Sequence, residues 1–167
     1  MDKATEILKK RRLLLAKNDA NTETGEYLDL LVFSLLPQKY ALEIEYLFEV
    51  FPLKRITSLP GVPPYFMGIV NVRGKIVDII NLKPFFGIHE TGLTELNKVI
   101  ILREEAKEFG VIADAIEGTL QILPEEILPT PARFQAGQEF VKGMTREGII
   151  VLDAPTIIHN EQFIIHQ

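Results

Sequence analysis

The spacing of apolar residues changes near residue 26, and this change divides the chain into a helical start and a region of strands. Five apolar residues of the first segment recur at intervals typical of one helix face: Ala4, Ile7, Leu8, Leu14 and Leu15. Residues 17–25 are mostly polar and predict a linker. We therefore expect a basic amphipathic helix and linker over residues 1–25, followed by a folded body over residues 26–167.

Beyond residue 26, apolar runs of strand length are separated by proline, glycine and charged residues. The runs cover 28–35, 40–45, 69–72, 75–80, 99–102, 109–113, 140–144 and 149–152. Apolar residues alternate with others over 40–45, which predicts a half-buried strand. Gly118 is expected to break the chain, and Asp153 followed by Pro155 predicts a short C-terminal helix. The body should therefore be all-β.

The two halves of the body show the same order of features. Each half begins with an apolar triplet and a stretch with prolines, followed by a pair ending in glycine, a turn ending in glycine and an apolar strand. The triplet, the glycine pair and the strand are residues 40–42, 67–68 and 76–81 in the first half, and 109–111, 142–143 and 149–153 in the second. This order predicts two similar small β-units, about 27–90 and 97–155. The alternative is that any chain of short strands would show such features.

Composition is that of an ordinary globular chain of 167 residues, 47% hydrophobic and 25% charged. We expect one domain, or two small subdomains that share a core. The chain has no cysteine, which excludes disulfides and thiolate sites and fits a reducing cytoplasm. No apolar run reaches the roughly 20 residues that span a bilayer. These observations predict a cytoplasmic protein with no direct membrane insertion.

Charge is distributed unevenly along the chain. Residues 1–17 carry six basic and two acidic side chains, a net +4, which leaves −9 on the remainder of a chain whose total is −5. The acidic body argues against a nucleic-acid partner. The basic start could contact an acidic partner or an anionic lipid surface.

Residues that could support catalysis or bind a cofactor form no recognisable constellation. The three histidines are scattered and are interpreted as surface residues: His89, His159 and His166. Ser34 and Ser58 lack the glycines of a nucleophile elbow, and no glycine-rich phosphate loop is present. The acidic pairs at 104–105 and 125–126 lie in polar turns, where solvated charges are usual. We expect a non-enzymatic protein without metal, nucleotide or flavin that acts through its surface.

Residues 63–77 resemble the core motif of the CheW family, in which Gly-Val-Ile-Asn-Leu-Arg-Gly follows a proline and precedes an apolar strand. Gly68, Asn71, Arg73 and Gly74 stand at the motif positions. Further segments resemble family motifs in the same order: 40–50, 109–114, 140–143 and 149–153. The resemblance extends from about residue 27 to residue 158.

Membership of this family would imply two SH3-like five-stranded β-barrels packed around a shared core, here with an N-terminal helical extension and a short C-terminal helix. It implies an adaptor that couples chemoreceptors to a CheA-like histidine kinase, in arrays at the inner face of the membrane. One barrel would engage the regulatory domain of the kinase. A groove between the barrels would take the cytoplasmic tip of a methyl-accepting chemoreceptor.

The resemblance carries six candidate partner-binding residues over to this chain: Ile44, Leu47, Glu49, Asn71, Arg73 and Gly74. The first three fall where the first barrel of the family contacts the kinase, and Arg73 falls at the arginine tied to coupling. The two apolar residues could equally be plain core, and Arg73 could be a solvated turn residue. Asn71 and Gly74 are better explained as turn formers than as contacts.

The chain departs from the family pattern at several positions. Asp78 stands where proline is usual, residues 81–83 read Asn-Leu-Lys where Asp-Leu-Arg is usual, and Phe48 replaces a common polar residue. The basic N-terminal extension is also additional to the minimal family. These departures leave an alternative function open, a stand-alone CheW-like regulator that competes for the kinase in a non-chemotaxis pathway.

Overall fold

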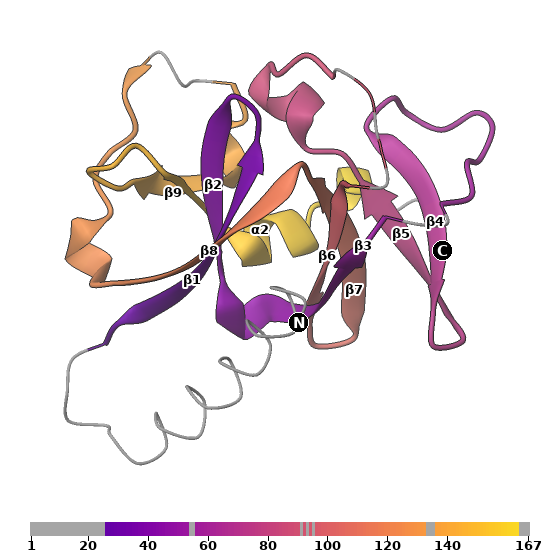
Figure 1. The fold of residues 1–167 in the computed structure, drawn as a ribbon, viewed down its shortest axis with the longest axis horizontal. Helices are drawn as coiled ribbons and strands as arrows, with labels where there is room; N and C mark the ends of the chain where they lie inside the picture. The colour runs from indigo at the N-terminus through magenta and orange to yellow at the C-terminus, as the bar shows by residue number, and fades with distance from the viewer. Residues whose placement is uncertain are drawn as a thin grey trace.

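The computed structural model describes residues 26–53, 56–90, 92, 94, 96–132 and 136–163, and it shows two five-stranded β-sheets (Figure 1). The strands of the first sheet, in spatial order, are β8 (Ala115–Ile122), β1 (Leu28–Leu35), β2 (Gln38–Glu43), β10 (Ile150–Leu152) and β9 (Val141–Met144). Those of the second are β3 (Leu47–Pro52), β6 (Lys98–Glu104), β7 (Lys107–Ala113), β5 (Lys75–Ile80) and β4 (Phe66–Val72). The all-β fold of two SH3-like five-stranded barrels is confirmed.

Short helices connect the strands. They are the 3₁₀ helices η1 (Ile44–Tyr46), η2 (Lys83–Phe86), η3 (Pro124–Glu126), η5 (Gln138–Phe140) and η6 (Glu161–Phe163), and the α-helix α2 (Ala154–Ile158). The predicted C-terminal helix is confirmed as α2. The side chain of Asp153 accepts a hydrogen bond from the backbone N–H of Thr156 at 3.1 Å and caps its first turn. In Figure 1, α2 lies between the two sheets.

Each sheet combines hairpins from both halves of the chain. The β1–β2 hairpin joins the β9–β10 hairpin through parallel pairing of β2 with β10. The β6–β7 hairpin joins the β4–β5 hairpin through parallel pairing of β7 with β5. The predicted division at 27–90 and 97–155 therefore does not coincide with the two sheets. Parallel partners need a long crossover connection, which the order of apolar runs along the chain does not reveal.

The predicted internal repeat is present as two similar sheets, not as two consecutive halves. In both sheets a central strand, β2 or β7, pairs with an antiparallel hairpin partner on one side and a parallel strand on the other. Glycines recur at equivalent positions as well. A Cβ atom on Gly68 would lie 2.3 Å from the carbonyl oxygen of Thr57, and one on Gly143 would lie 2.4 Å from that of Leu128.

Five strands, β1, β2, β6, β7 and β10, bury both faces over most of their length, because one face lines the interior of its own barrel and the other packs between the barrels. In β1, Leu31 belongs to the shared core and Val32 to the interior of the first barrel. In β6, Ile100 belongs to the shared core and Ile101 to the interior of the second barrel. Two-sided burial explains why these strands are continuous apolar runs in the sequence.

The prediction of a half-buried strand over 40–45 is wrong for β2. Ala41 is fully buried and Glu43 is only 5% exposed, because the second face of β2 points into the first barrel. The Glu43 carboxylate is paired with the Nζ of Lys142 on β9 at 3.1 Å. A buried carboxylate loses its hydration, and a paired cation compensates for that loss. The cation here, Lys142, lies 99 residues away in the sequence.

The strands β3 and β8 were not predicted. Gly118, expected to break the chain, lies inside β8 with φ of 145°. The pairing of β1 with β8 shifts register between Val32 and Phe33, where Val32 is opposite Gly118 and Phe33 is opposite Ile116. The glycine therefore marks a β-bulge and not an end of the strand.

The predicted N-terminal helix and linker lie outside the described residues, as does His166. Within the part of the chain that the structure describes, no helix has the length and apolar character needed to cross a membrane.

Candidate functional site

The tip of the β4–β5 hairpin is a two-residue turn that presents a single arginine. Arg73 and Gly74 both have positive φ, 53° and 85°, as a type I′ turn requires. The side-chain oxygen of Asn71 accepts a hydrogen bond from the backbone N–H of Gly74 at 2.7 Å. Asn71 and Gly74 are thus turn formers. A non-glycine residue in this backbone region costs about 1–2 kcal/mol, so Arg73 occupies a strained position at an exposed tip.

Arg73 is joined to a second candidate residue, Glu49 on β3. Its Nη2 lies 3.3 Å from the Oε1 of Glu49, and the two side chains are 75% and 22% exposed. Because β3 and β4 are the two edge strands of the second sheet, the pair connects the edges where the barrel closes. The other oxygen of Glu49, Oε2, is shielded from solvent and has no hydrogen-bond donor among the described residues. The glutamate therefore holds the arginine through one oxygen only.

Further charged side chains extend this surface across the neighbouring strands. The side chain of Glu108 on β7 is 3% exposed and is bound by two cations, the Nζ of Lys75 at 3.4 Å and the Nε of Arg103 at 2.8 Å. The guanidinium of Arg103 also lies 3.5 Å from the centroid of the Phe48 ring. Phe48, noted as a departure from the family pattern, is therefore covered by a cation from β6, a contact that stabilises both groups. We call Glu49, Arg73, Lys75, Arg103 and Glu108 the hairpin surface.

Two candidate residues lie elsewhere. Ile44 is 3% exposed and Leu47 is 1% exposed, and both belong to the shared core. This burial fits the interpretation of the two residues as plain core. Any effect of Ile44 or Leu47 on a partner must therefore act through the position of the segment that leads from η1 into β3.

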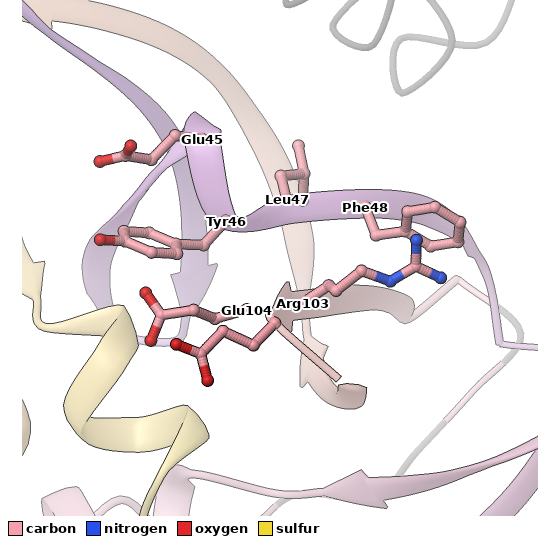
Figure 2. Close-up of a pocket in the computed structure, with 7 residues that line it drawn as sticks. Glu45, Tyr46, Leu47, Phe48, Arg103 and Glu104 are labelled. Atoms are coloured by element: carbon pink, nitrogen blue, oxygen red, sulfur yellow. The ribbon is translucent and has the colours of Figure 1, made fainter. Parts of the chain in front are cut away.

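A cleft of about 340 Å³ lies beside η1 and the β6–β7 turn (Figure 2). It is lined by Glu45, Tyr46, Leu47, Phe48, Arg103, Glu104 and Glu105, and we call it the acidic cleft. Burial, then the charges of Glu45, Glu43, Glu104 and Asp153, raise the pKa of Tyr46 to about 12. Burial, together with Glu43 and Glu104, also raises the pKa of Glu45, while Lys142 lowers it. Burial is the main cause of both shifts, and neighbouring carboxylates add to it.

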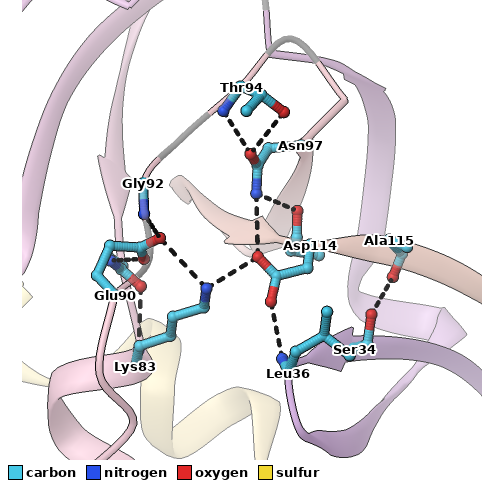
Figure 3. A network of polar contacts seen from close by, with 11 residues as sticks. Ser34, Leu36, Lys83, Glu90, Gly92, Thr94, Asn97, Asp114 and Ala115 are labelled. Carbon is cyan, nitrogen blue, oxygen red and sulfur yellow. Dashed lines mark hydrogen bonds and ion pairs between the residues drawn. The ribbon is translucent and has the colours of Figure 1, made fainter.

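A buried polar network lies where the β1–β2 turn meets the loop after β5 (Figure 3). At its centre, the Nζ of Lys83 lies 2.8 Å from a carboxylate oxygen of Asp114 and 3.3 Å from one of Glu90. The Lys83 side chain is 3% exposed. Asp114 also accepts hydrogen bonds from the backbone N–H of Leu36 and the side chain of Asn97, at 2.7 and 3.1 Å. The network joins loops from both sheets.

This network changes the interpretation of a second departure from the family pattern. Asn81 and Lys83 stand at motif positions that were expected to bear on the choice of partner, yet both are buried, 4% and 3% exposed. The side chain of Asn81 accepts a hydrogen bond from the backbone N–H of Lys83 at 3.0 Å and donates one to Glu90 at 3.0 Å. These residues hold loops together and do not present a surface to a partner.

The residues considered for catalysis remain apart. His159 contacts the Glu104 carboxylate, and no other imidazole contact is recorded among the described residues. Within that part of the chain, no group of three or more histidine or acidic side chains is placed to hold a metal ion. Ser34 donates a hydrogen bond to the carbonyl oxygen of Ala115. The geometry thus offers surfaces and a cleft for recognition.

Comparison with known proteins gives the family. The model of the CheW-like domain matches residues 29–162. The chemotaxis protein CheW of Treponema pallidum (strain Nichols) is 29% identical, with 91% of each chain covered. The chemotaxis protein CheW of Bacillus subtilis (strain 168) is 26% identical, with 85% of this chain and 92% of that one covered. The crystal structure of the scaffolding protein TtCheW from Thermoanaerobacter tengcongensis is similar with a TM-score of 0.69 and 32% identity, over 77% of this chain and 90% of that one. The chain belongs to the CheW-like domain family.

Proposed function

We propose that this chain is a non-enzymatic adaptor that couples chemoreceptors to a CheA-like histidine kinase. The match to the CheW-like domain over most of the chain and the chemotaxis proteins among its relatives support this function. The regulatory domain of the kinase is the proposed partner of the barrel formed by β3 to β7, which carries Glu49 and Arg73, and the cytoplasmic tip of a chemoreceptor is the proposed partner of the groove between the barrels. No observation favours the alternative of a stand-alone competitor.

The observation that carries the proposal is the exposed arginine at the β4–β5 tip. Arg73 is 75% exposed and is oriented by Glu49, while Asn71 and Gly74 fix the turn. Arginine offers a planar, permanently charged fork that suits a carboxylate or backbone carbonyls of a partner. Orientation by a partly buried glutamate limits the conformations that the side chain must give up on binding. Arg73 is therefore the proposed centre of the contact.

The test is isothermal titration calorimetry of the chain with the regulatory domain of a CheA-like kinase from the same organism. Transient signalling contacts of this kind have affinities near micromolar, about −8 kcal/mol. Truncation of an interface arginine costs about 2 kcal/mol or more, so Arg73→Ala should weaken binding about thirtyfold. The free energy of unfolding should change by less than about 1 kcal/mol, since the ion pair is largely exposed.

A matched control is available in the other barrel. Arg146 is an exposed arginine in the β9–β10 turn, at the equivalent hairpin of the first sheet. Arg146→Ala should leave kinase binding unchanged. Equal loss with both variants would assign the effect to general charge, and full binding by Arg73→Ala would contradict the proposed centre. Absence of heat with every CheA-like kinase of the organism would contradict the adaptor function itself.

Receptor coupling needs a separate measurement. Kinase activity in the presence of receptor-containing membranes should rise when the wild-type chain is added and should rise less with Arg73→Ala. A chain that binds the kinase but lowers its receptor-dependent activity would instead be the stand-alone competitor.

A further inference from the structure

The exposed charge of the hairpin surface has one sign. The side chains of Arg73, Lys75 and Arg103 are 75%, 57% and 42% exposed. Those of Glu49 and Glu108, which bind these cations, are only 22% and 3% exposed. The cations therefore lie outermost, with the carboxylates beneath them. A partner that approaches this end of the second sheet meets the cations first.

The cations also outnumber the carboxylates that bind them. Glu108 lies opposite Arg103 in the register of β6 and β7, and it binds both Arg103 and Lys75. Glu49 binds Arg73. Three cations against two carboxylates leave a net +1 on the hairpin surface, in a body whose net charge is −9. The sign of this surface is therefore opposite to that of the body.

The two acidic residues that follow Arg103 line the acidic cleft. In Figure 2 the guanidinium of Arg103 is directed toward Phe48, whereas the Glu104 carboxylate lies at the other end of the cleft. Neighbouring residues of a strand point to opposite faces, which explains this separation. The Glu104 carboxylate contacts the imidazole of His159, just after α2. The carboxylate next to Arg103 in the sequence is thus already paired, away from the hairpin surface.

Neutralisation of the shielded carboxylates does not by itself account for these cations. Glu108 needs one compensating charge and has two. Arg73 has a φ of 53°, a conformation that glycine or asparagine would adopt at lower cost. Arginine at this position costs stability and leaves three quarters of its side chain in solvent. The arrangement therefore fits recognition better than packing.

We propose that Arg73, Lys75 and Arg103 form one cationic contact surface for an acidic face of the kinase regulatory domain. This inference rests on the proposed function and adds the chemistry of the partner's side. Opposite charges across an interface accelerate association and disfavour partners whose face is basic. Because Glu49 and Glu108 hold the cations in place, less side-chain freedom is lost on binding.

Charged nitroxide co-solutes test the surface in the full-length chain without a partner. An anionic and a cationic nitroxide of the same size are added separately to ¹⁵N-labelled protein at low salt. We expect the anionic nitroxide to relax the amides of residues 73–75 and 103 more strongly than the cationic one, by at least about twofold. The exposed acidic residues of η3, Glu125 and Glu126, should show the opposite order.

Association kinetics with the regulatory domain of a CheA-like kinase test the partner's side. Lys75→Glu should slow association at least about threefold in 0.1 M NaCl, because it reverses one charge of the surface. Arg103 still binds Glu108 in this variant, so the fold should persist. Lys39→Glu is the matched control, since Lys39 is exposed in β2 of the first sheet and its reversal changes the net charge equally. It should change the association rate less than about 1.5-fold.

The same measurement at high salt separates charge from shape. In 1 M NaCl the screening length falls from about 10 Å to about 3 Å, so the wild type and Lys75→Glu should associate at rates within about twofold of each other. The basic residues 1–17 also respond to salt. The difference between the two variants, and not salt dependence alone, therefore assigns the effect to the hairpin surface.

The outcomes distinguish this inference from the proposed function. Kinase binding that Lys75→Glu does not slow, or that Lys39→Glu slows equally, would overturn the acidic partner face and leave the adaptor function in place. Absence of binding to every CheA-like kinase of the organism would overturn both. A reversed order of relaxation by the two nitroxides at residues 73–75 and 103 would overturn the cationic surface, whether or not the kinase binds.

Discussion

Removal of one charged partner from the buried network around Lys83 should destabilise the fold strongly, and Asp114→Asn is the perturbation that tests this. The substitution keeps the size of the side chain and removes the charge that faces the Nζ of Lys83 at 2.8 Å. Because Lys83 is 3% exposed, its ammonium cannot recover the lost interaction from water. The second carboxylate, Glu90, remains at 3.3 Å, but its side chain is 29% exposed and compensates only in part.

The magnitude follows from this geometry. Removal of one member of a buried pair costs about 3–5 kcal/mol, and the remaining Glu90 places the expected loss near the lower end, about 3 kcal/mol. For a chain of this length, 1 kcal/mol shifts Tm by about 2–4 °C, so Tm should fall by about 6–12 °C. The exposed ion pair of Arg73 and Glu49 serves as a comparison for this buried pair. Arg73→Ala, which breaks the pair with Glu49, should cost about 1 kcal/mol or less.

Urea unfolding of a double-mutant cycle is the assay. Lys83→Met replaces the ammonium by an apolar side chain of similar length, and the double variant with Asp114→Asn has neither charge. We expect the double variant to be more stable than the sum of the single losses predicts, by at least 1 kcal/mol, because each single variant leaves a buried charge without its partner. Additive losses, or a loss below 1 kcal/mol for Asp114→Asn, would refute the reasoning.

Two further predictions concern backbone packing and tyrosine ionisation. Gly68→Ala should lower the free energy of unfolding by more than about 2 kcal/mol, since its Cβ would lie 2.3 Å from the backbone oxygen of Thr57 at φ of 147°. Gly74→Asn, where a Cβ meets no atom within 4 Å, should cost less than about 1 kcal/mol, and equal urea midpoints for both variants would contradict this account. The raised pKa of Tyr46 means that the folded state holds its proton while the unfolded state loses it above pH 10, so stability should fall as pH rises from 10 towards 12. In an absorbance titration at alkaline pH, the Tyr46→Phe variant should lack one of the tyrosines that ionise late in the wild-type protein. A titration identical to that of the wild type would show that the assignment of the raised pKa to Tyr46 is wrong.

Local patterns in the sequence were sufficient to predict most strands and the turn at the candidate site. The type I′ turn follows from glycine between two apolar strands, and Asp153 with Pro155 indicates α2, because these signals act within a few residues. The positions of Glu49 and Arg73 were carried over from the family resemblance. Their contact could not be predicted, since it joins residues 24 apart across the closure of the barrel.

Contacts between distant segments explain what the sequence could not reveal. Glu43 looked like the polar side of a half-buried strand, and only Lys142, on the strand two places away, shows why it is buried. Lys83 looked like a substitution at a partner-facing motif, and only Asp114 and Glu90 show that it is internal. Charged residues carry no mark of burial in the sequence, because their cost depends on partners placed by the tertiary fold.

The exchange of hairpins between halves of the chain bears on how an adaptor of this family can work. Independent domains usually meet through modest, rather polar interfaces and move relative to one another. Here the two sheets share one apolar core, to which β1, β6 and α2 all contribute, and each sheet needs strands from both halves. Separation of the barrels would expose that core, so the barrels present their surfaces in a fixed relation. Regulation is therefore expected at side chains that can change partners without unfolding, namely Arg73 at the hairpin tip and its neighbours Lys75 and Arg103.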